Sequence, residues 1–322
     1  MSFEALNEEP EARGRRRTED AAPERDGWEL GEGDEIAPGR TAVRLLGGGE
    51  RYETYLAWDD RLLSLVVVKI VRPSLVNDEH SREGLATEAD LLLRLRHPVL
   101  VRGFDAVLDG PRPHVALEHL EGSRLSSLIR KQGPLEPEQL YPLGLQLASA
   151  VHYLGGEGLV HLDVKPSNVI MGAPARLIDL SIVRTVETLK TVDHRIGTDA
   201  YMAPEQCDPV GRGPMTPAAD VWGIGATLYH AAAGRRPFPA GDRAGSLEER
   251  FPQLVMGAEP LPYPVPPGLA ELIEACLEPD PPARPAPAEL AAELERLVDT
   301  LPKRPVLSRF RVRPRRRDPL GL

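Results

Sequence analysis

The sequence has few cysteines and no apolar stretch of membrane-spanning length. Its 322 residues include two cysteines, Cys207 and Cys276, which provide neither a disulfide framework nor the ligand spacing of a metal site. The longest largely apolar run, from Leu62 to Val68, is too short to cross a bilayer. The N-terminus is acidic, whereas a signal peptide begins with a basic segment followed by an apolar one. These absences predict a cytoplasmic protein without a transmembrane segment.

Acidic residues outnumber basic ones except at the C-terminal end. The net charge is −10, yet residues 302–322 contain eight Lys or Arg and one Asp, so this tail carries +7 and the remaining 301 residues carry −17. Such a block is either a solvated disordered tail or a segment that docks on the acidic body or on an anionic partner. No nucleic-acid binding is expected from it.

The chain divides into a leader, one long folded region and the tail. Residues 1–34 are polar and charged, with Trp28 as an isolated aromatic residue, and they predict a disordered leader. Residues 35–301 are long enough for one two-lobed domain, with a small lobe over about 35–121 and a large lobe over about 122–301. The leader and the tail are also where regulatory proteins are expected to bind.

One short stretch carries most of the chemistry. The segment HLDVKPSNVIM, His161 to Met171, contains a carboxylate (Asp163), an ammonium (Lys165) and an amide (Asn168) at close spacing. A second carboxylate, Asp179, follows a short apolar run that predicts a buried strand. This set suits phosphoryl transfer, in which one acid orients a hydroxyl, the other acid and the amide hold a divalent metal, and the ammonium neutralises charge.

This stretch resembles the catalytic loop of the eukaryotic-like serine/threonine protein kinases, a family with many bacterial members. The resemblance implies an α+β, two-lobed fold with a small antiparallel β lobe carrying one helix and a larger, mainly helical lobe. It implies transfer of the γ-phosphoryl group of ATP to Ser/Thr hydroxyls of protein substrates, with autophosphorylation. In it Asp163 orients the hydroxyl and accepts its proton, and Lys165 contacts the γ-phosphate. Asn168 and Asp179 would hold Mg²⁺, with Mn²⁺ as an alternative.

A glycine-rich turn precedes this stretch by more than a hundred residues. In LLGGGERYETYLAWD, the family's GxGxxG pattern places its first two glycines at Gly47 and Gly49 and its third position at Tyr52. Leu46 and Thr54 would cover the nucleotide, although Thr54 stands where the family usually has Val. A glycine triplet in a hairpin equally predicts a simple turn.

A lysine in an apolar strand needs a partner. Lys69 is the one charged residue in the run LVVVKIV, and the next predicted helix offers Glu88, with Glu83 as a competitor. Glu88 falls among leucines at helical spacing, which places it on the inward face. The resemblance implies that Glu88 holds Lys69 and that Lys69 holds the nucleotide. The alternative is an edge lysine that reaches solvent.

Two further strands, Val99 to Val107 and His114 to Leu120, are predicted to complete a five-stranded antiparallel lobe. By the resemblance, Leu117 is the gatekeeper, and the backbones of Glu118 and Leu120 contact the adenine at the hinge between the lobes.

The large lobe is predicted to be helical. A long amphipathic helix ends at Gly155-Gly156 and delivers the chain to the catalytic loop. Asp220 opens an apolar helix and is expected either to cap that helix or to anchor the catalytic loop. The segment GTDAYMAPEQ resembles an activation segment, with Thr198 beside the substrate hydroxyl and Glu205 paired with Arg284.

Two alternatives remain open. A pseudokinase that binds nucleotide and acts as a scaffold is favoured by Tyr52, by Leu162 in place of the Arg of the HRD motif, and by Ser181 in place of the Gly of DFG. A small-molecule phosphotransferase of the same fold is opposed by the GTDAYMAPEQ segment, which resembles a peptide-docking loop.

The first testable prediction concerns activation. In the family, the Arg replaced here by Leu162 grips a phosphate on the activation segment, so phosphorylation there is not expected to be an obligatory switch. Proteins with Thr185, Thr188 and Thr191 replaced by Ala should still transfer labelled phosphate to protein. Thr198→Ala is assayed separately because this residue is expected beside the substrate. Loss of transfer to every substrate in the triple variant would contradict the prediction.

Overall fold

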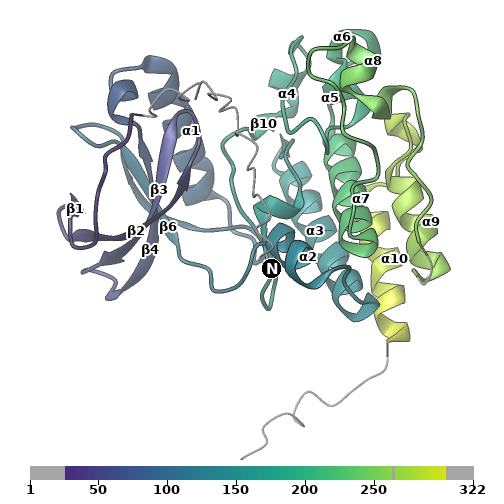
Figure 1. Cartoon of the computed structure of the whole chain (residues 1–322), viewed down its shortest axis with the longest axis horizontal. Coiled ribbons are helices and arrows are strands. Elements are labelled where there is room, and N and C mark those ends of the chain that lie inside the picture. Colours follow the sequence, from purple (N-terminus) through teal and green to yellow (C-terminus); the bar gives the residue numbers. More distant parts are fainter. Residues whose placement is uncertain (1–25, 263–264, 302–322) are drawn as a thin grey trace, which may run out of the picture.

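The computed structural model describes residues 26–262 and 265–301, which form two lobes (Figure 1). The predicted tail, 302–322, and most of the predicted leader, 1–25, lie outside these residues. Within the described ranges, no helix combines the length and the apolar character required of a membrane span.

The small lobe is an antiparallel sheet with the strand order β1-β2-β3-β4-β6-β5. Alternating burial along β4 (Ser64–Val71) places one face of the sheet in the small-lobe core and the other toward the large lobe. The other strands are β1 (Glu35–Ala37), β2 (Arg40–Gly48), β3 (Tyr52–Asp59), β5 (Gly103–Val107) and β6 (His114–Glu118).

The prediction of five strands was wrong, because β1 adds a sixth in the described part of the chain. Ile36 at its centre is buried in the small-lobe core, which explains why so short a strand pairs with β2. The strand predicted from Val99 begins at Gly103 instead. Residues Val99 and Val101 exchange backbone hydrogen bonds with Leu177 of the large lobe, at 2.7 and 3.0 Å.

Helix α1 (Glu79–Arg94) packs against the sheet of the small lobe, on the side nearer the large lobe (Figure 1). It begins where the side chain of Asp78 accepts a hydrogen bond from the backbone N–H of Ser81, a typical N-cap. It follows the short 3-10 helix η1 (Pro73–Leu75). Gly103 allows β5 to approach the helix, since a Cβ there would lie 2.9 Å from the Cβ of Leu92.

The last residues of the predicted leader contact the small lobe. The indole Nε1 of Trp28 donates to the carbonyl of Val71 at 2.8 Å, and its backbone N–H donates to Glu53 at 3.0 Å. The guanidinium of Arg72 donates to the carbonyl of Asp26 at 2.6 Å. Leu30 packs with Trp28 against the small-lobe core. Composition alone missed this docking because two isolated apolar residues give no periodic pattern.

Helices α3 (Pro137–Gly156) and α7 (Pro217–Ala233) form the centre of the large lobe (Figure 1). Nearly every residue of α7 is buried, as its apolar sequence predicts. Around them lie α2 (Leu125–Gln132), α4 (Val186–Leu189), α5 (Pro204–Cys207), α6 (Pro209–Arg212), α8 (Leu247–Arg250), α9 (Pro267–Cys276), α10 (Pro287–Thr300) and the 3-10 helices η3 (Pro252–Leu254) and η4 (Pro281–Ala283). Short strand pairs, β7 (Leu159–Val160) with β10 (Arg184–Thr185) and β8 (Val169–Ile170) with β9 (Arg176–Leu177), flank the catalytic loop.

A buried ion pair holds the end of the segment GTDAYMAPEQ (residues 197–206, the activation-like segment) against the rest of the large lobe. Arg284 donates to both carboxylate oxygens of Glu205 at 2.7 and 2.9 Å, and both side chains are at most 1% exposed. Its guanidinium also donates to three backbone carbonyls and lies 5.0 Å from the ring of Trp222. These additional bonds satisfy the buried charge, which a lone ion pair would not.

Replacing Arg284 with Ala should therefore lower the free energy of unfolding by about 3–5 kcal/mol, because it leaves a buried carboxylate without a partner. Urea unfolding followed by circular dichroism measures this change. Arg296→Ala is the matched control, since Arg296 pairs with Glu293 at the surface and should have little effect. Equal effects of the two substitutions would contradict the prediction.

Candidate active site

The catalytic loop lies between β7 and β8 and is held from below by α7. Both oxygens of Asp220 accept backbone hydrogen bonds, from the N–H groups of His161 and Leu162, each at 2.7 Å. Leu162 has a φ of 67°, a left-handed conformation that is unfavourable for a branched side chain. The two bonds to Asp220 stabilise this turn, and the following Asp163 bonds the hydroxyl of Thr198.

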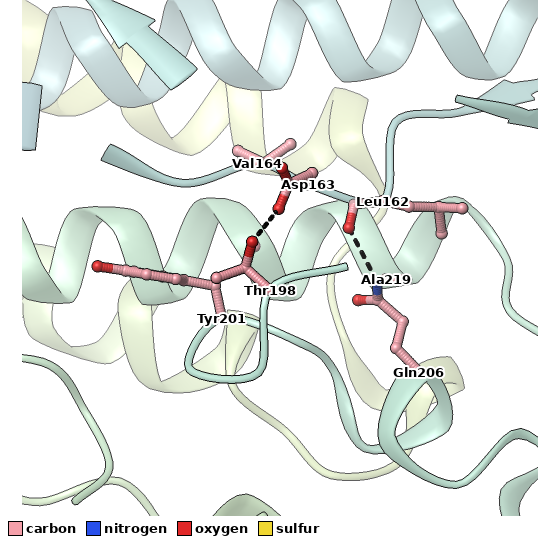
Figure 2. Close-up of a pocket in the computed structure, with 8 residues that line it drawn as sticks. Leu162, Asp163, Val164, Thr198, Tyr201, Gln206 and Ala219 are labelled. Atoms are coloured by element: carbon pink, nitrogen blue, oxygen red, sulfur yellow. Dashed lines mark hydrogen bonds between the residues drawn. The ribbon is translucent and has the colours of Figure 1, made fainter. Parts of the chain in front are cut away.

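The polar side chains predicted for the loop converge on Asp163, and Figure 2 shows the bond that Thr198 makes with it. Lys165 donates to Asp163 Oδ2 at 2.6 Å, and Asn168 donates to the same oxygen at 2.9 Å and to the Asp163 carbonyl at 3.0 Å. The hydroxyl of Thr198 donates to Asp163 Oδ1 at 2.7 Å and accepts from Lys165 at 2.5 Å. A carboxylate and an ammonium therefore already bind one hydroxyl between them.

A second cluster joins the two lobes. Lys69 on β4 donates to both oxygens of Glu88 on α1, at 2.9 and 2.7 Å, and to Asp179 of the large lobe at 3.3 Å. The predicted competitor Glu83 is exposed and is not the partner. Glu88 is 1% exposed, so helical periodicity identified the inward-facing acid correctly.

The charges of this cluster support one another. Burial alone would lower the pKa of Lys69, but the carboxylates of Glu88 and Asp179 outweigh it and raise the pKa. Burial opposes the ionisation of Asp179, yet Lys69 and hydrogen bonds from Ser181 lower its pKa to about 2. Lys69 and Asp179 are therefore charged at neutral pH, whereas burial raises the pKa of Glu88 against the opposing charge of Lys69.

Asn168 and Asp179 fit a divalent metal by the chemistry of their donors. Asn168 uses its Nδ2 amide to bond Asp163, which orients its Oδ1 oxygen as the remaining donor. Asp179 offers a carboxylate that stays ionised. Two oxygen donors of this kind match Mg²⁺, which binds one or two protein groups and completes its shell with phosphate and water oxygens.

The predicted nucleotide residues of the small lobe lie on the β2–β3 hairpin. Gly47 pairs with Thr54 across the hairpin and has a φ of 147°, which only glycine adopts readily. Leu46 is partly exposed beside it, and Gly49 donates its N–H to the carbonyl of Tyr52 at 3.0 Å. This bond closes the turn between the two strands.

The predicted hinge residues occupy the end of β6 and the connection to α2. Leu117 is buried and packs in the large core that spans both lobes, and Leu120 is half-buried against it. The backbone N–H of Glu118 donates to the carbonyl of Arg102, so its contact with an adenine would be through its own carbonyl. The Glu118 side chain forms an ion pair with Arg176 and accepts from the Arg102 N–H at 2.8 Å.

One residue of the site was missed by sequence reasoning. The amide of Gln206 donates to the carbonyl of Leu162 at 2.9 Å and to that of Ile196 at 2.8 Å, which ties the activation-like segment to the catalytic loop (Figure 2). The sequence offered one clue, that Gln206 directly follows Glu205, but no local pattern predicts that a glutamine at this position bonds Leu162.

Comparisons with known proteins agree with this geometry. The family model described as the protein kinase domain matches residues 40–294. The serine/threonine-protein kinase PkaA of Streptomyces coelicolor is 34% identical over 237 residues, covering 71% of this chain and 42% of that protein. The probable serine/threonine-protein kinase PkwA of Thermomonospora curvata is 34% identical over 267 residues, covering 82% and 35%. PknL of Mycobacterium tuberculosis, also a serine/threonine-protein kinase, is 30% identical over 273 residues, covering 83% and 66%. The chain thus spans less than half the length of the first two relatives.

The anchor of the catalytic loop predicts a pH dependence of stability. Burial raises the pKa of Asp220 from 3.8 to about 7, although the two N–H donors oppose this shift. Between these values the folded state retains a proton that the unfolded chain has lost, so the free energy of unfolding falls as pH rises from about 4 to about 7. Across this range the wild type should lose roughly 3–4 kcal/mol relative to Asp220→Asn, which has no carboxyl to titrate at this position.

Denaturant unfolding of both proteins at several pH values measures this difference. Other titrating groups are common to both and cancel. Curves of stability against pH that run parallel would show that Asp220 is already ionised near pH 4.

Proposed function

This chain belongs to the protein kinase family, among the bacterial-type serine/threonine members, and on that basis we propose that it transfers the γ-phosphoryl group of ATP to Ser/Thr hydroxyls of protein substrates. The observation that carries the proposal is the contact of Lys69 with Asp179 across the two lobes, beside a catalytic loop in which Asp163 already binds a hydroxyl. Lys69 and Asp179 lie 110 positions apart in the sequence, and the fold brings them together.

The side chains of the catalytic loop supply the proton transfer and part of the charge stabilisation. Asp163 would orient the substrate hydroxyl and accept its proton as the oxygen attacks the γ-phosphorus and the bond to the β-phosphate oxygen breaks, with ADP leaving. Lys165, 2.6 Å from Asp163, places an ammonium where negative charge moves from donor to acceptor. The hydroxyl of Thr198 marks where an acceptor hydroxyl can meet both groups.

The nucleotide and metal would be held by groups from both lobes. Lys69, fixed by Glu88, would bind the phosphates, and Asn168 and Asp179 would hold Mg²⁺ or Mn²⁺. The bound metal neutralises charge on the phosphate oxygens. Main-chain groups of Gly47 and Gly49, the carbonyl of Glu118 and the backbone of Leu120 would contact the nucleotide, with Leu46, Thr54 and Leu117 around its base.

Leu162, which stands in place of the HRD arginine, is held through its main chain. Leu162 is buried, with its N–H bonded to Asp220 and its carbonyl bonded to Gln206. The activation-like segment is therefore fastened to the catalytic loop without a phosphate. This supports a kinase whose catalytic loop is positioned before any phosphorylation.

The pseudokinase alternative is less well supported. The substitutions at Leu162 and Ser181 leave every predicted metal and proton-transfer group in contact with its neighbours, and the relatives bear the names of serine/threonine-protein kinases.

We further propose a cytoplasmic location, which two free, buried thiols suit. We also propose that the protein is controlled by other proteins that bind residues 1–34 or 302–322.

Labelled ATP with Mg²⁺ or Mn²⁺, followed by mass spectrometry of the modified sites, tests the proposal. The wild type should phosphorylate itself or a protein substrate. Asp163→Asn should reduce the rate by at least about 10²-fold, because the amide cannot accept the proton, while nucleotide still binds. Asp109→Asn, on the exposed loop before β6, is the matched control and should remain active. Nucleotide binding without transfer by the wild type would favour the pseudokinase instead.

A further inference from the structure

Tyr52 occupies the third position of the glycine pattern, and its side chain points toward α1. In the β3–β4 pair, Thr54 lies opposite Lys69 and Tyr52 opposite Val71. Because side chains alternate along a strand, Tyr52 and Lys69 stand on the same face of the sheet as diagonal neighbours. The aromatic ring is therefore directed to the cluster that joins the lobes.

The tyrosine contacts both the lysine and the helix. The ammonium of Lys69 lies 4.9 Å from the centroid of the Tyr52 ring, within the range of a cation–π interaction. The Tyr52 hydroxyl donates to the carbonyl of Ser81, in the first turn of α1, at 2.9 Å. Burial raises the pKa of Tyr52, so this hydroxyl keeps its proton for the bond.

A glycine in α1 makes room for this contact. Gly84 lies in the interior of the helix, where glycine costs about 1 kcal/mol relative to Ala. A Cβ on Gly84 would lie 2.9 Å from the Tyr52 hydroxyl, closer than such contacts occur. The helix thus lacks a side chain where the tyrosine approaches it.

The backbone of Tyr52 also closes the glycine-rich turn. Its carbonyl accepts the N–H of Gly49 at 3.0 Å, and Arg72 donates to the Gly49 carbonyl at 2.8 Å. A Cβ on Gly48 would lie 2.9 Å from the Tyr52 carbonyl oxygen. One residue therefore bonds the turn through its main chain and α1 through its side chain.

We propose that Tyr52 is a positioning residue that ties the glycine-rich turn to α1 and holds the Lys69–Glu88 pair aligned for the nucleotide phosphates. This inference rests on the proposed function, since it assumes that Lys69 binds nucleotide. A flexible glycine at this position would leave the turn and the helix to move independently. The tyrosine couples them, so the turn is ordered before nucleotide arrives.

Three substitutions separate the contacts of Tyr52. Tyr52→Phe removes the bond to Ser81 but keeps the ring over Lys69, and Tyr52→Leu removes both. Gly84→Ala displaces the hydroxyl without altering the tyrosine. Tyr153→Phe is the matched control, because the Tyr153 hydroxyl also bonds a backbone group, the N–H of Arg96 at 3.0 Å, just beyond the end of α1 opposite to Ser81.

Two measurements do not depend on phosphoryl transfer. Calorimetric titration with ADP, with and without Mg²⁺, gives the nucleotide affinity, and hydrogen exchange of residues 47–51 in nucleotide-free protein reports the order of the turn. Tyr52→Phe and Gly84→Ala should each weaken ADP binding about fivefold, the value of one hydrogen bond, and Tyr52→Leu should weaken it further. All three should speed exchange in the turn, and Tyr153→Phe should change neither quantity.

A double substitution sharpens the test. Adding Gly84→Ala to Tyr52→Leu should cause no further loss of ADP affinity, because the hydroxyl that the methyl group displaces is already gone. Unchanged ADP affinity and exchange in Tyr52→Phe and Tyr52→Leu, with a wild type that binds ADP, would overturn the role of Tyr52 alone. Failure of the wild type to bind ADP or ATP would overturn the proposed function and this role with it.

Discussion

The candidate active site depends on two short hydrogen bonds from the catalytic loop to one buried carboxyl group. Asp220 is 1% exposed in the middle of the large lobe, and its oxygens bind the N–H groups of His161 and Leu162. These bonds hold Leu162 in a left-handed turn that its own side chain disfavours. Without that turn, Asp163 would not face Thr198. The almost wholly apolar helix α7 is thus the rigid support on which a polar loop is mounted.

The small lobe is aligned with this support through a few contacts that cross the cleft. Lys69 meets Asp179, and the chain between α1 and β5 pairs with Leu177 through the backbone of Val99 and Val101. The first contact is electrostatic and pairs a charge of the small lobe with one of the large lobe. The second is a pair of backbone hydrogen bonds, which sets the distance between the two segments. Helix α1 lies between them, so the position of Glu88 is set by both.

Much of this arrangement was accessible from the sequence because it is local or periodic. Asp163, Lys165 and Asn168 lie close together in the sequence, within one loop. The periodicity of the leucines selected Glu88 over Glu83 as the partner of Lys69. What could not be predicted depends on contacts between distant segments. The docking of Trp28 and the bond of Gln206 to Leu162 involve partners tens of residues away that no local pattern identifies. Strand β1 pairs with the neighbouring β2, but its three residues are too few to show a period. The direction of Tyr52 required the register of β3 against β4, which composition does not supply.

The segment that precedes β1 has a practical consequence for anyone who trims this protein. The family match begins at residue 40. Before it, the indole of Trp28 donates a hydrogen bond to the carbonyl of Val71. The guanidinium of Arg72 donates to Asp26 as well as to Gly49 and Glu53. A fragment cut at the limit of the match would strip an indole from the core and leave Arg72 with fewer acceptors at the root of the glycine-rich turn. Weak nucleotide binding by such a fragment would then be an artefact of where it was cut.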